Sequence, residues 1–494
     1  MKKSYMYSAI IIIGLASVFL LVSFVFQNDN SSSKTNDLSE LAESKPLPIP
    51  PLLEDLDPDP NRAEFHLTAQ RGMSEILDGV ESETLGYNGN ILGPVIRVHQ
   101  GEKVKVKMKN SLDEATTLHW HGLRVDGEND GGPHSGIMPD ETWEPEFTIE
   151  QPAATLWYHP HMMEKTAKQV YEGLAGLFYI EDEVSDSLAI PKDYGVNDFP
   201  LIIQDRKMDA SGNLQYDPNL TDMMRGLYGN AFLVNGAISP YLEVPKGMVR
   251  LRILNGSNGR TYNFSLGNGQ TFHQIASDGG FLEQPIEMSE IRLSPAERAE
   301  ILVDFSSFET GEKIAFINTA TDLVDSASDS DEDVDITELV EFVVTDKASG
   351  VNDIPSQLTE IEPIDPSNAV KTREFVMEGM GTTLTINDKQ MDMTRIDEEV
   401  DFNATEIWEV SNKAAGKNGG MAHPFHIHGV QFQVLDRDSN PPPANESGWK
   451  DTVLLQPGET VRLIVTFKNK GIFMYHCHIL EHEDAGMMGQ YEVK

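Results

Sequence analysis

The histidines of this sequence gather in pairs separated by a single residue. The 494 residues include 14 histidines, for which random placement predicts only about 0.4 His-x-His pairs. The sequence instead contains four, at His119/His121, His159/His161, His426/His428 and His476/His478. Residues i and i+2 of a β-strand point to the same face, so each pair presents two imidazoles side by side. Imidazole binds copper, zinc, iron and nickel, and eight imidazoles are too many for one ion, so the pattern predicts a cluster of several metal ions.

The only cysteine, Cys477, lies between the two histidines of the last pair. With one cysteine no intramolecular disulfide is possible, and on a strand its side chain points away from the face that its neighbours share. His482 and Met487 follow it, and His423 lies upstream. Two histidines, a cysteine and a weak axial methionine form a blue-copper electron-transfer site. Zinc is the main alternative metal, but its closed sites rarely use methionine, so we predict copper.

The order of these residues suggests how the two sites communicate. Cys477 binds one copper in this interpretation, while the adjacent His476 and His478 reach the cluster on the other face of the strand. An electron can then pass from the sulfur site through the backbone to the cluster. Three coppers plus one store four electrons, which is the number needed to reduce O₂ to two waters.

Short strand-like runs make up most of the chain beyond residue 60. Many of them alternate or are β-branched, Gly, Pro, Asn and Asp separate them, and no long amphipathic helix interrupts them. The pattern predicts an all-β body of sandwich domains in three sections, at 61–182, 198–346 and 370–494. Segments that begin at Gly101, Gly247 and Gly458 resemble one another, each with a turn glycine before an alternating strand. This similarity suggests one β-domain used three times.

The N-terminus has the features of an export signal. Lys2 and Lys3 precede an uncharged apolar run, Ser8–Phe26, and acidic residues follow it. The run is long and no Ala-x-Ala site follows, which favours an uncleaved membrane anchor in residues 1–27, while a cleaved signal peptide stays open. Residues 28–60 are rich in Ser, Pro and acidic side chains and predict a flexible, disordered stalk. We therefore expect an extracytoplasmic protein, anchored at the cell surface or secreted.

The charge balance excludes one class of function. The sequence has 38 basic and 79 acidic residues and a net charge of −41, which repels nucleic-acid phosphate. We therefore expect no nucleic-acid partner, and membrane contact only through the N-terminal segment. Acidic residues concentrate between Asp325 and Asp335, where a solvated loop is the simple interpretation and weak cation attraction the alternative.

Four motifs make the sequence resemble the three-domain multicopper oxidases, the family of laccases, bilirubin oxidases and bacterial cuprous oxidases. They are His119-Trp-His-Gly, His159-Pro-His, His423-Pro-Phe-His-Ile-His-Gly and His476-Cys-His-Ile-Leu-Glu-His-Glu-Asp-Ala-Gly-Met. Gly448-Trp-Lys-Asp-Thr is also similar to the family. The resemblance covers nearly all of Phe65–Val493 and implies three cupredoxin-like Greek-key β-sandwich domains, with the middle one a spacer.

The resemblance also implies four copper ions, and every ligand position of the family is matched by a residue of this sequence. It implies a type 1 copper at His423, Cys477, His482 and Met487, a type 2 copper at His119 and His426, and a type 3 pair at His121, His159 and His478 and at His161, His428 and His476.

Two acidic residues have candidate catalytic roles by the same resemblance. Asp130 matches an acid that delivers protons to the cluster, and Glu483 matches one that accompanies the exit of water. Reducing O₂ consumes four protons, so acids near the cluster are physically required. The alternative is a turn-forming Asp and a surface Glu.

The reducing substrate is a separate question from the reaction. Cuprous oxidases of the family carry a long methionine-rich insertion, whereas here four methionines are scattered within Phe375–Thr394, at Met377, Met380, Met391 and Met393. Their expected role is core packing. Gly419 replaces a family acid near His423, although Met421 matches. We therefore expect an exposed type 1 copper that oxidises phenols or aromatic amines, with O₂ as acceptor.

The main alternative is a cuprous oxidase in copper tolerance. Three other classes are less favoured. A non-catalytic copper-binding protein would not need the Cys477 bridge to a cluster, a structural relative that has lost its coppers would lack ligands, and a copper nitrite reductase has two domains and does not flank its cysteine with two cluster histidines. A monomer is expected.

Overall fold

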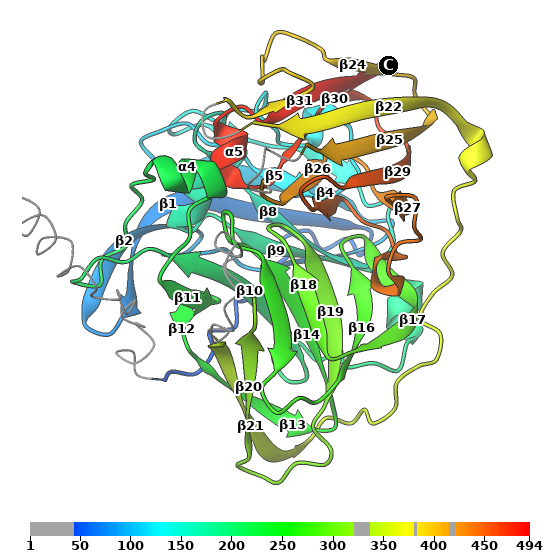
Figure 1. Cartoon of the computed structure of the whole chain (residues 1–494). Coiled ribbons are helices and arrows are strands. Elements are labelled where there is room, and N and C mark those ends of the chain that lie inside the picture. Colours follow the sequence, from blue (N-terminus) through cyan, green and yellow to red (C-terminus); the bar gives the residue numbers. More distant parts are fainter. Residues whose placement is uncertain (1–43, 321–335, 380–382, 414–419) are drawn as a thin grey trace, which may run out of the picture.

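The computed structural model describes residues 44–320, 336–379, 383–413 and 420–494. The predicted export segment Ser8–Phe26 and the acidic loop Asp325–Asp335 lie outside these ranges. Within them, the strands form six sheets that pair into three sandwiches, so the predicted all-β fold is confirmed (Figure 1). Each sandwich has its own core, because one face of each of its two sheets is apolar and packs against the other sheet.

The first sandwich pairs the sheet β2-β1-β4-β6, with β7 on β4, with the sheet β3-β9-β8-β5. Its elements are β1 (Arg62–Leu77), β2 (Val80–Tyr87), β3 (Ile96–His99), β4 (Lys103–Asn110), β5 (His119–His121), η2 (Gly127–Asn129), β6 (Thr142–Trp143), β7 (Glu146–Thr148), β8 (Ala154–His159), α2 (Thr166–Glu172), β9 (Gly176–Glu181) and α3 (Glu183–Ser187).

The middle sandwich pairs the sheet β12-β11-β10-β14-β19-β16-β17 with the sheet β13-β21-β20-β15-β18. Its elements are β10 (Asp198–Arg206), α4 (Leu220–Arg225), β11 (Ala231–Val234), β12 (Ala237–Ile238), β13 (Tyr241–Lys246), β14 (Met248–Asn255), β15 (Tyr262–Leu266), β16 (Phe272–Ser277), β17 (Gly280–Met288), β18 (Glu290–Leu293), β19 (Arg298–Asp304), β20 (Lys313–Asn318) and β21 (Thr337–Ala348).

The third sandwich pairs the sheet β23-β22-β25-β29-β27 with the sheet β24-β31-β30-β26-β28. Its elements are η3 (Pro366–Asn368), β22 (Ala369–Glu378), β23 (Thr385–Ile386), β24 (Glu398–Val400), β25 (Thr405–Asn412), β26 (His423–Ile427), β27 (Phe432–Arg437), η6 (Ala444–Glu446), β28 (Thr452–Leu455), β29 (Thr460–Thr466), β30 (Gly471–Cys477), α5 (Leu480–Asp484) and β31 (Met488–Val493).

The three sandwiches share a parallel strand pair, which supports the idea of one repeated domain. The pairs are β1 with β4, β10 with β14, and β22 with β25. The similar glycine segments do not all mark this pair. Gly101 and Gly247 precede β4 and β14, but Gly458 precedes β29, which is antiparallel to β25. All three glycines have positive φ, so the shared pattern reflects the turn that starts a strand rather than one topological position.

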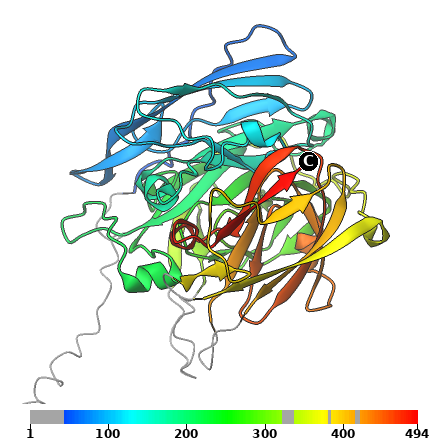
Figure 2. The same ribbon diagram turned by 90° about the horizontal axis from the view of Figure 1, so that it is seen from above.

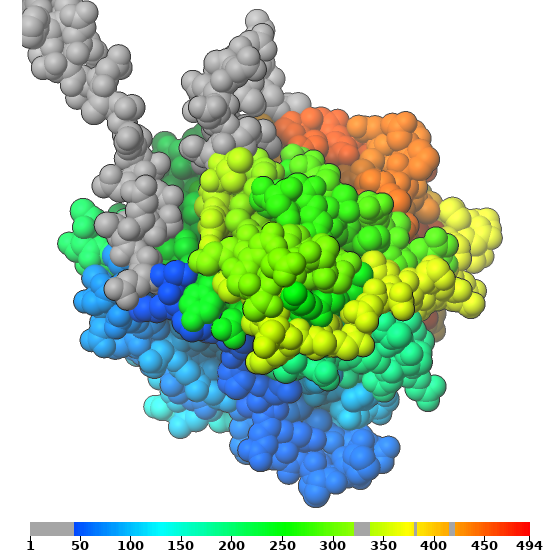
Figure 3. Space-filling view, turned by 90° about the horizontal axis from the view of Figure 1, so that it is seen from below, coloured from blue at the N-terminus to red at the C-terminus, as the bar shows by residue number. Residues whose placement is uncertain are grey.

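The connection between the second and third sandwiches follows the surface of the molecule. Residues 349–365 run along the outside of the middle sandwich, in yellow, before β22 begins (Figures 1 and 3). Leu358 attaches the connection, because its side chain is buried and its N–H donates to the carbonyl of Glu283. The chain thereby passes the middle sandwich and places the third beside the first (Figure 2).

The prediction of a flexible stalk is wrong for residues 44–60. Leu47 is buried in the middle-sandwich core, and its N–H donates to the carbonyl of Tyr241. The N–H of Tyr241 in turn donates to the carbonyl of Lys45. Further along, Leu53 and Pro51 bond Val95 of the first sandwich. The proline-rich composition indicates an extended chain, and an extended chain can also pair with strand edges. In the described ranges, no helix has both the length and the apolar character needed to cross a membrane.

Replacing Leu47 by Ala tests this attachment. Leu47 is 6% exposed, so the cavity weakens the docking of the segment by about 2–5 kcal/mol. Limited proteolysis should then cut residues 44–60 faster than in the unmodified protein. Leu52→Ala is the matched control, because Leu52 is 42% exposed in the same segment. Equal cleavage of the two variants would contradict the attachment.

Candidate metal centre

The four His-x-His pairs meet where the first and third sandwiches face each other. In the first, β5 pairs with β8 so that His119 is opposite His159, and in the third, β26 pairs with β30 so that His426 is opposite His476. The first pair lies within β5, as predicted. The other three pairs extend past the end of their strand. His428 and His478 follow β26 and β30 directly, and His161 lies two residues beyond the end of β8. All eight side chains are buried.

Rings from the two sandwiches stack on one another across this interface. His121 stacks on His426 with ring centroids 3.7 Å apart, and His119 stacks on His428 at 3.8 Å. The histidine cluster is therefore shared by two domains rather than contained in one.

Most of the clustered imidazoles donate a hydrogen bond from one ring nitrogen to an oxygen atom of the protein. The Nδ1 atoms of His119, His159, His426, His428 and His476 lie 2.8–3.1 Å from such oxygens. A neutral imidazole has one N–H, so a hydrogen bond at Nδ1 leaves the lone pair on Nε2. This is the arrangement that metal-ligating histidines adopt.

Three of the free nitrogens converge on one point. The Nε2 atoms of His161, His428 and His476 lie 3.1–3.2 Å from one another. Three nitrogens this close to one another could all bind one metal ion, because metal–imidazole bonds are about 2.0–2.1 Å long.

The other imidazoles form a second group with the same property. Ligand atoms of His121, His159 and His478 lie within 4.8 Å of one another, as do those of His119, His121 and His426. Nε2 of His119, Nε2 of His426 and both nitrogens of His478 are buried without a hydrogen-bond partner. Such buried polar atoms are costly unless something binds them, so these residues fit metal ions.

Burial keeps the rings in the form that binds metal. It lowers the pKa of His476 to about 3 and holds the pKa of His121, His159 and His428 well below the ordinary value, helped by repulsion from neighbouring rings. The pKa of His161, His426 and His478 is likewise lowered, with burial the largest cause. Neutral rings keep the lone pairs that metal ions need.

A sulfur site lies inside the third sandwich, behind the cluster. Cys477 belongs to that domain's apolar core, and its Sγ is 3.4 Å from Nδ1 of His423 and 3.6 Å from Nδ1 of His482. Met487 is buried beside them, and its carbonyl accepts from the Cys477 N–H at 3.0 Å. Burial raises the pKa of the Cys477 thiol, so the thiolate forms only with a bound cation, as coordination to copper would provide.

The expected exposure of the sulfur site is wrong on the His482 side. The His482 ring is fully buried, and its Nε2 donates to the carbonyl of Met224 at 3.1 Å. Met224 belongs to α4, a middle-domain helix that packs on α5. The short Phe375–Thr394 region does not predict that His482 is covered, because the covering residue Met224 belongs to another domain.

The two predicted carboxylates both reach the histidine cluster. Oδ2 of Asp130 lies 2.9 Å from Nδ1 of His428, and its Oδ1 is buried without a hydrogen bond. Glu483 lies with Oε1 3.4 Å from Nδ1 of His161 and Oε2 3.3 Å from Nδ1 of His476. The alternative of a surface Glu is wrong, since Glu483 is buried. Asp130 does end the short turn η2, where its backbone N–H donates to the carbonyl of Gly127, but its side chain is buried as well. Burial raises the pKa of Glu483 well above its ordinary value, which favours the protonated form of this acid.

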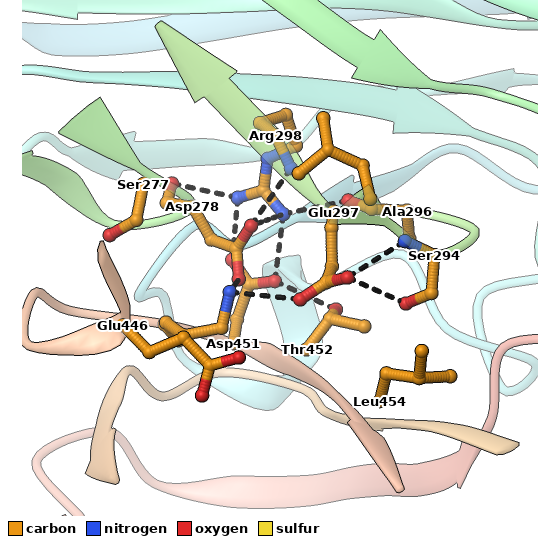
Figure 4. Close-up of polar contacts among 12 residues, drawn as sticks. Ser277, Asp278, Ser294, Ala296, Glu297, Arg298, Glu446, Asp451, Thr452 and Leu454 are labelled. Atoms are coloured by element: carbon orange, nitrogen blue, oxygen red, sulfur yellow. Dashed lines mark hydrogen bonds and ion pairs between the residues drawn. The ribbon is translucent and has the colours of Figure 1, made fainter. Parts of the chain in front are cut away.

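Sequence reasoning missed Asp451 and the residues that hold it. Asp451 accepts from Nε2 of His121 at 3.0 Å, and Arg298 of the middle sandwich forms a bidentate pair with its carboxylate (Figure 4). The motif Gly448-Trp-Lys-Asp-Thr contains Asp451, but nothing in the motif indicates that Asp451 contacts an arginine 153 positions earlier in the chain.

The comparisons with known proteins agree with this centre. Models of the multicopper oxidase family match residues 68–185, 210–323 and 362–494. The chain belongs to the multicopper oxidase family. It is therefore a copper-dependent oxidoreductase with O₂ as acceptor, and its three sandwiches are cupredoxin-like domains.

Several relatives align over almost the whole chain. "Multicopper oxidase mco" of Staphylococcus haemolyticus is 42% identical over 94% of both chains. The crystal structure of a laccase from Pediococcus acidilactici is 42% identical, covers 92% of this chain and 94% of its own, and has a TM-score of 0.84. "Cell division protein FtsP" of Escherichia coli is 37% identical over 92% of this chain and 93% of its own. These relatives include an oxidase, a laccase and a cell division protein, so similarity alone does not identify the reducing substrate of this chain.

Cys477→Ser tests the sulfur site. Serine removes the soft ligand that copper bonds strongly, so the copper-loaded variant should lose its blue absorption and its oxidase activity together. Copper content per chain, visible absorption and O₂ uptake measure the effect. His66→Ala is the control, because this exposed histidine contacts Glu64 and belongs to neither metal group described above. A blue, active Cys477→Ser protein would refute the site.

Proposed function

We propose that this multicopper oxidase is laccase-like, taking single electrons from phenols or aromatic amines and passing four of them to O₂. The observation that carries the proposal is the arrangement around Cys477. One strand end presents a sulfur to the His423 and His482 site and, one residue away on each side, an imidazole to the histidine cluster.

The proposal includes four copper ions and assigns every ligand. His423, Cys477, His482 and Met487 hold type 1 copper, His119 and His426 hold type 2, and His121, His159, His478 and His161, His428, His476 hold the type 3 pair. The grouping of ligand atoms supports these sets, because three of them coincide with converging groups of histidine or cysteine atoms. When bound, the coppers supply the one-electron and four-electron redox chemistry that no side chain provides.

The residues of the chain supply the connection and the protons. The backbone of His476, Cys477 and His478 links the sulfur site covalently to the cluster. Glu483 holds a proton next to Nδ1 of two cluster histidines, and Asp130 offers a buried carboxylate to a third. These positions suit donation and transfer of the four protons that O₂ reduction consumes.

The choice of an organic donor rests on the surroundings of the sulfur site. Met377 is fully buried in the third-domain core, as expected of a packing residue, while Met380 and Gly419 lie outside the described residues. Helix α4, which holds His482, leaves Leu220 70% exposed and offers an apolar contact for an aromatic donor. The laccase of Pediococcus acidilactici, similar over most of the chain, supports the same choice.

A cuprous oxidase is the second candidate, and one observation favours it. Met391 is half-buried, and its N–H donates to the carbonyl of Gly486, the residue before Met487. A thioether at this place can attract Cu(I). A non-catalytic copper-binding role is less well supported, since all twelve proposed ligand residues are present and buried.

We also propose an extracytoplasmic location and a monomeric state. The apolar run Ser8–Phe26 supports export, either as a retained anchor or as a cleaved signal, and the net charge of −41 opposes self-association.

Donor preference can be measured directly. The purified, copper-loaded protein should consume O₂ faster per copper with a phenol such as 2,6-dimethoxyphenol than with Cu(I), because the methionines near the sulfur site are few. Mn(II) and bilirubin complete the panel of donors. Faster oxidation of Cu(I) would establish the second candidate instead.

Asp130→Ala tests the proton role at the cluster. The substitution leaves the sulfur site untouched, so the blue absorption should be retained while O₂ reduction slows about 10- to 100-fold. Glu128→Ala is the matched control, because this residue of the same loop is exposed. Unchanged turnover in Asp130→Ala would remove the proposed role.

A further inference from the structure

Arg298 lies where the three domains meet (Figure 4). It is the first residue of β19 and is fully buried. Its Nε donates to the carbonyl of Thr155 in the first domain, and Nη1 and Nη2 donate to the carbonyls of Ala296 and Asp278 in the middle domain. The remaining two N–H groups bond Asp451 of the third domain, at 2.8 Å and 2.6 Å. All five donors of the guanidinium are therefore used, which fixes its orientation.

Asp451 transmits that orientation to the histidine cluster. Its Oδ1, which Arg298 also bonds, accepts from Nε2 of His121 at 3.0 Å. Its main-chain carbonyl accepts from Nδ1 of His426 at 2.8 Å. Asp451 thus contacts both rings of the stacked His121–His426 pair that joins the first and third domains. The Thr452 hydroxyl lies 3.2 Å from the same two ring nitrogens and donates to Oδ1 of Asp451 at 2.9 Å, so it belongs to the same network.

His121 is turned the opposite way from the clustered histidines that hold an oxygen at Nδ1. Its Nε2 faces the Asp451 carboxylate, and its Nδ1 faces inward, 3.4 Å from Nε2 of His159. A neutral ring with its proton on Nε2 has its lone pair on Nδ1. The carboxylate therefore selects which nitrogen is available as a ligand.

The charges around Arg298 are balanced within the same junction. Lys450 is buried between Asp278 at 2.9 Å and Glu297 at 3.0 Å, and Asp278 also accepts from the Arg298 backbone N–H. Burying charged groups is costly unless groups of opposite charge lie beside them, and here each buried cation lies beside a carboxylate. The backbone is equally constrained, since a Cβ on Gly122 would lie 2.5 Å from Oδ2 of Asp451 and 2.8 Å from Nη2 of Arg298.

We propose that Arg298 of the middle domain is a positioning residue for the copper cluster, acting through Asp451 on the orientation of His121. The inference rests on the proposed assignment of His121 as a copper ligand. The middle domain is then more than the spacer that the family resemblance implied, because it contributes the group that fixes a ligand ring shared between its two neighbours.

The test compares two buried arginines of the middle domain. Arg298→Lys keeps the charge and removes the planar fork. Arg250→Lys is the matched control, because Arg250 is also buried and bonds one carboxylate through two nitrogens, but that carboxylate is Glu300. Both variants are loaded with copper. Blue absorption, the paramagnetic resonance signal of type 2 copper, the near-ultraviolet absorption of the type 3 pair and retention of copper against a chelator are then measured.

Arg298→Lys should keep its blue absorption, alter the type 2 and type 3 signals, and lose cluster copper at about 10- to 100-fold lower chelator concentration. Its kcat should fall while KM for the donor stays unchanged. Arg250→Lys should retain all four signals. Cluster signals in Arg298→Lys that match those of the unmodified protein, or that change equally in Arg250→Lys, would overturn the inference.

A second variant covers the case in which Arg298→Lys does not fold. Asp451→Asn keeps an oxygen that accepts from His121 but removes the charge that pairs with Arg298. It should show the same altered cluster signals with the blue absorption retained, and unaltered signals would overturn the inference. An unmodified protein that takes up copper without turning blue would instead overturn the proposed function, and the inference with it.

Discussion

The metal centre depends on a single repeated constraint, in which a buried neutral imidazole is held at one nitrogen so that the other faces inward. His119, His159, His426, His428 and His476 meet it through Nδ1, and His121 meets it through Nε2. The acceptors are backbone carbonyls and two carboxylates, and residues just outside the strands, such as Asp130, Pro160 and Asp451, supply most of them. Burial adds the second half of the constraint, because a ring that cannot be protonated keeps its lone pair for a metal ion.

The sequence was a good guide to which histidines lie together, because their spacing follows strand geometry. A His-x-His repeat identifies its own neighbours, and the Cys477 motif carries a sulfur and two imidazoles on opposite faces of the same chain segment. The three-sandwich fold was equally accessible from short alternating runs and turn residues. These features are local, and each can be recognised from a few consecutive residues.

What the sequence concealed is contact between distant segments. Met224 covers His482 across a separation of 258 residues, and Arg298 reaches Asp451 across 153. Neither residue has a local pattern that distinguishes it from the other methionines and arginines. The attachment of residues 44–60 was missed for a related reason, because proline-rich chain is compatible both with a free stalk and with a strand that pairs at an edge.

Because imidazoles of the first and third domains stack on one another, the metal centre can form only after both domains have been synthesised. His119 and His121 belong to the first sandwich and are made before the rings of the third sandwich on which they stack, His428 and His426. The first sandwich has its own core and can fold while the rest of the chain is still being made, so half of the clustered histidines are then in place before their stacking partners in the third sandwich exist. The histidine cluster is complete only once the third sandwich has folded and docked against the first. Correct metal loading is therefore expected to follow the docking of these two domains, and it reports that they have come together.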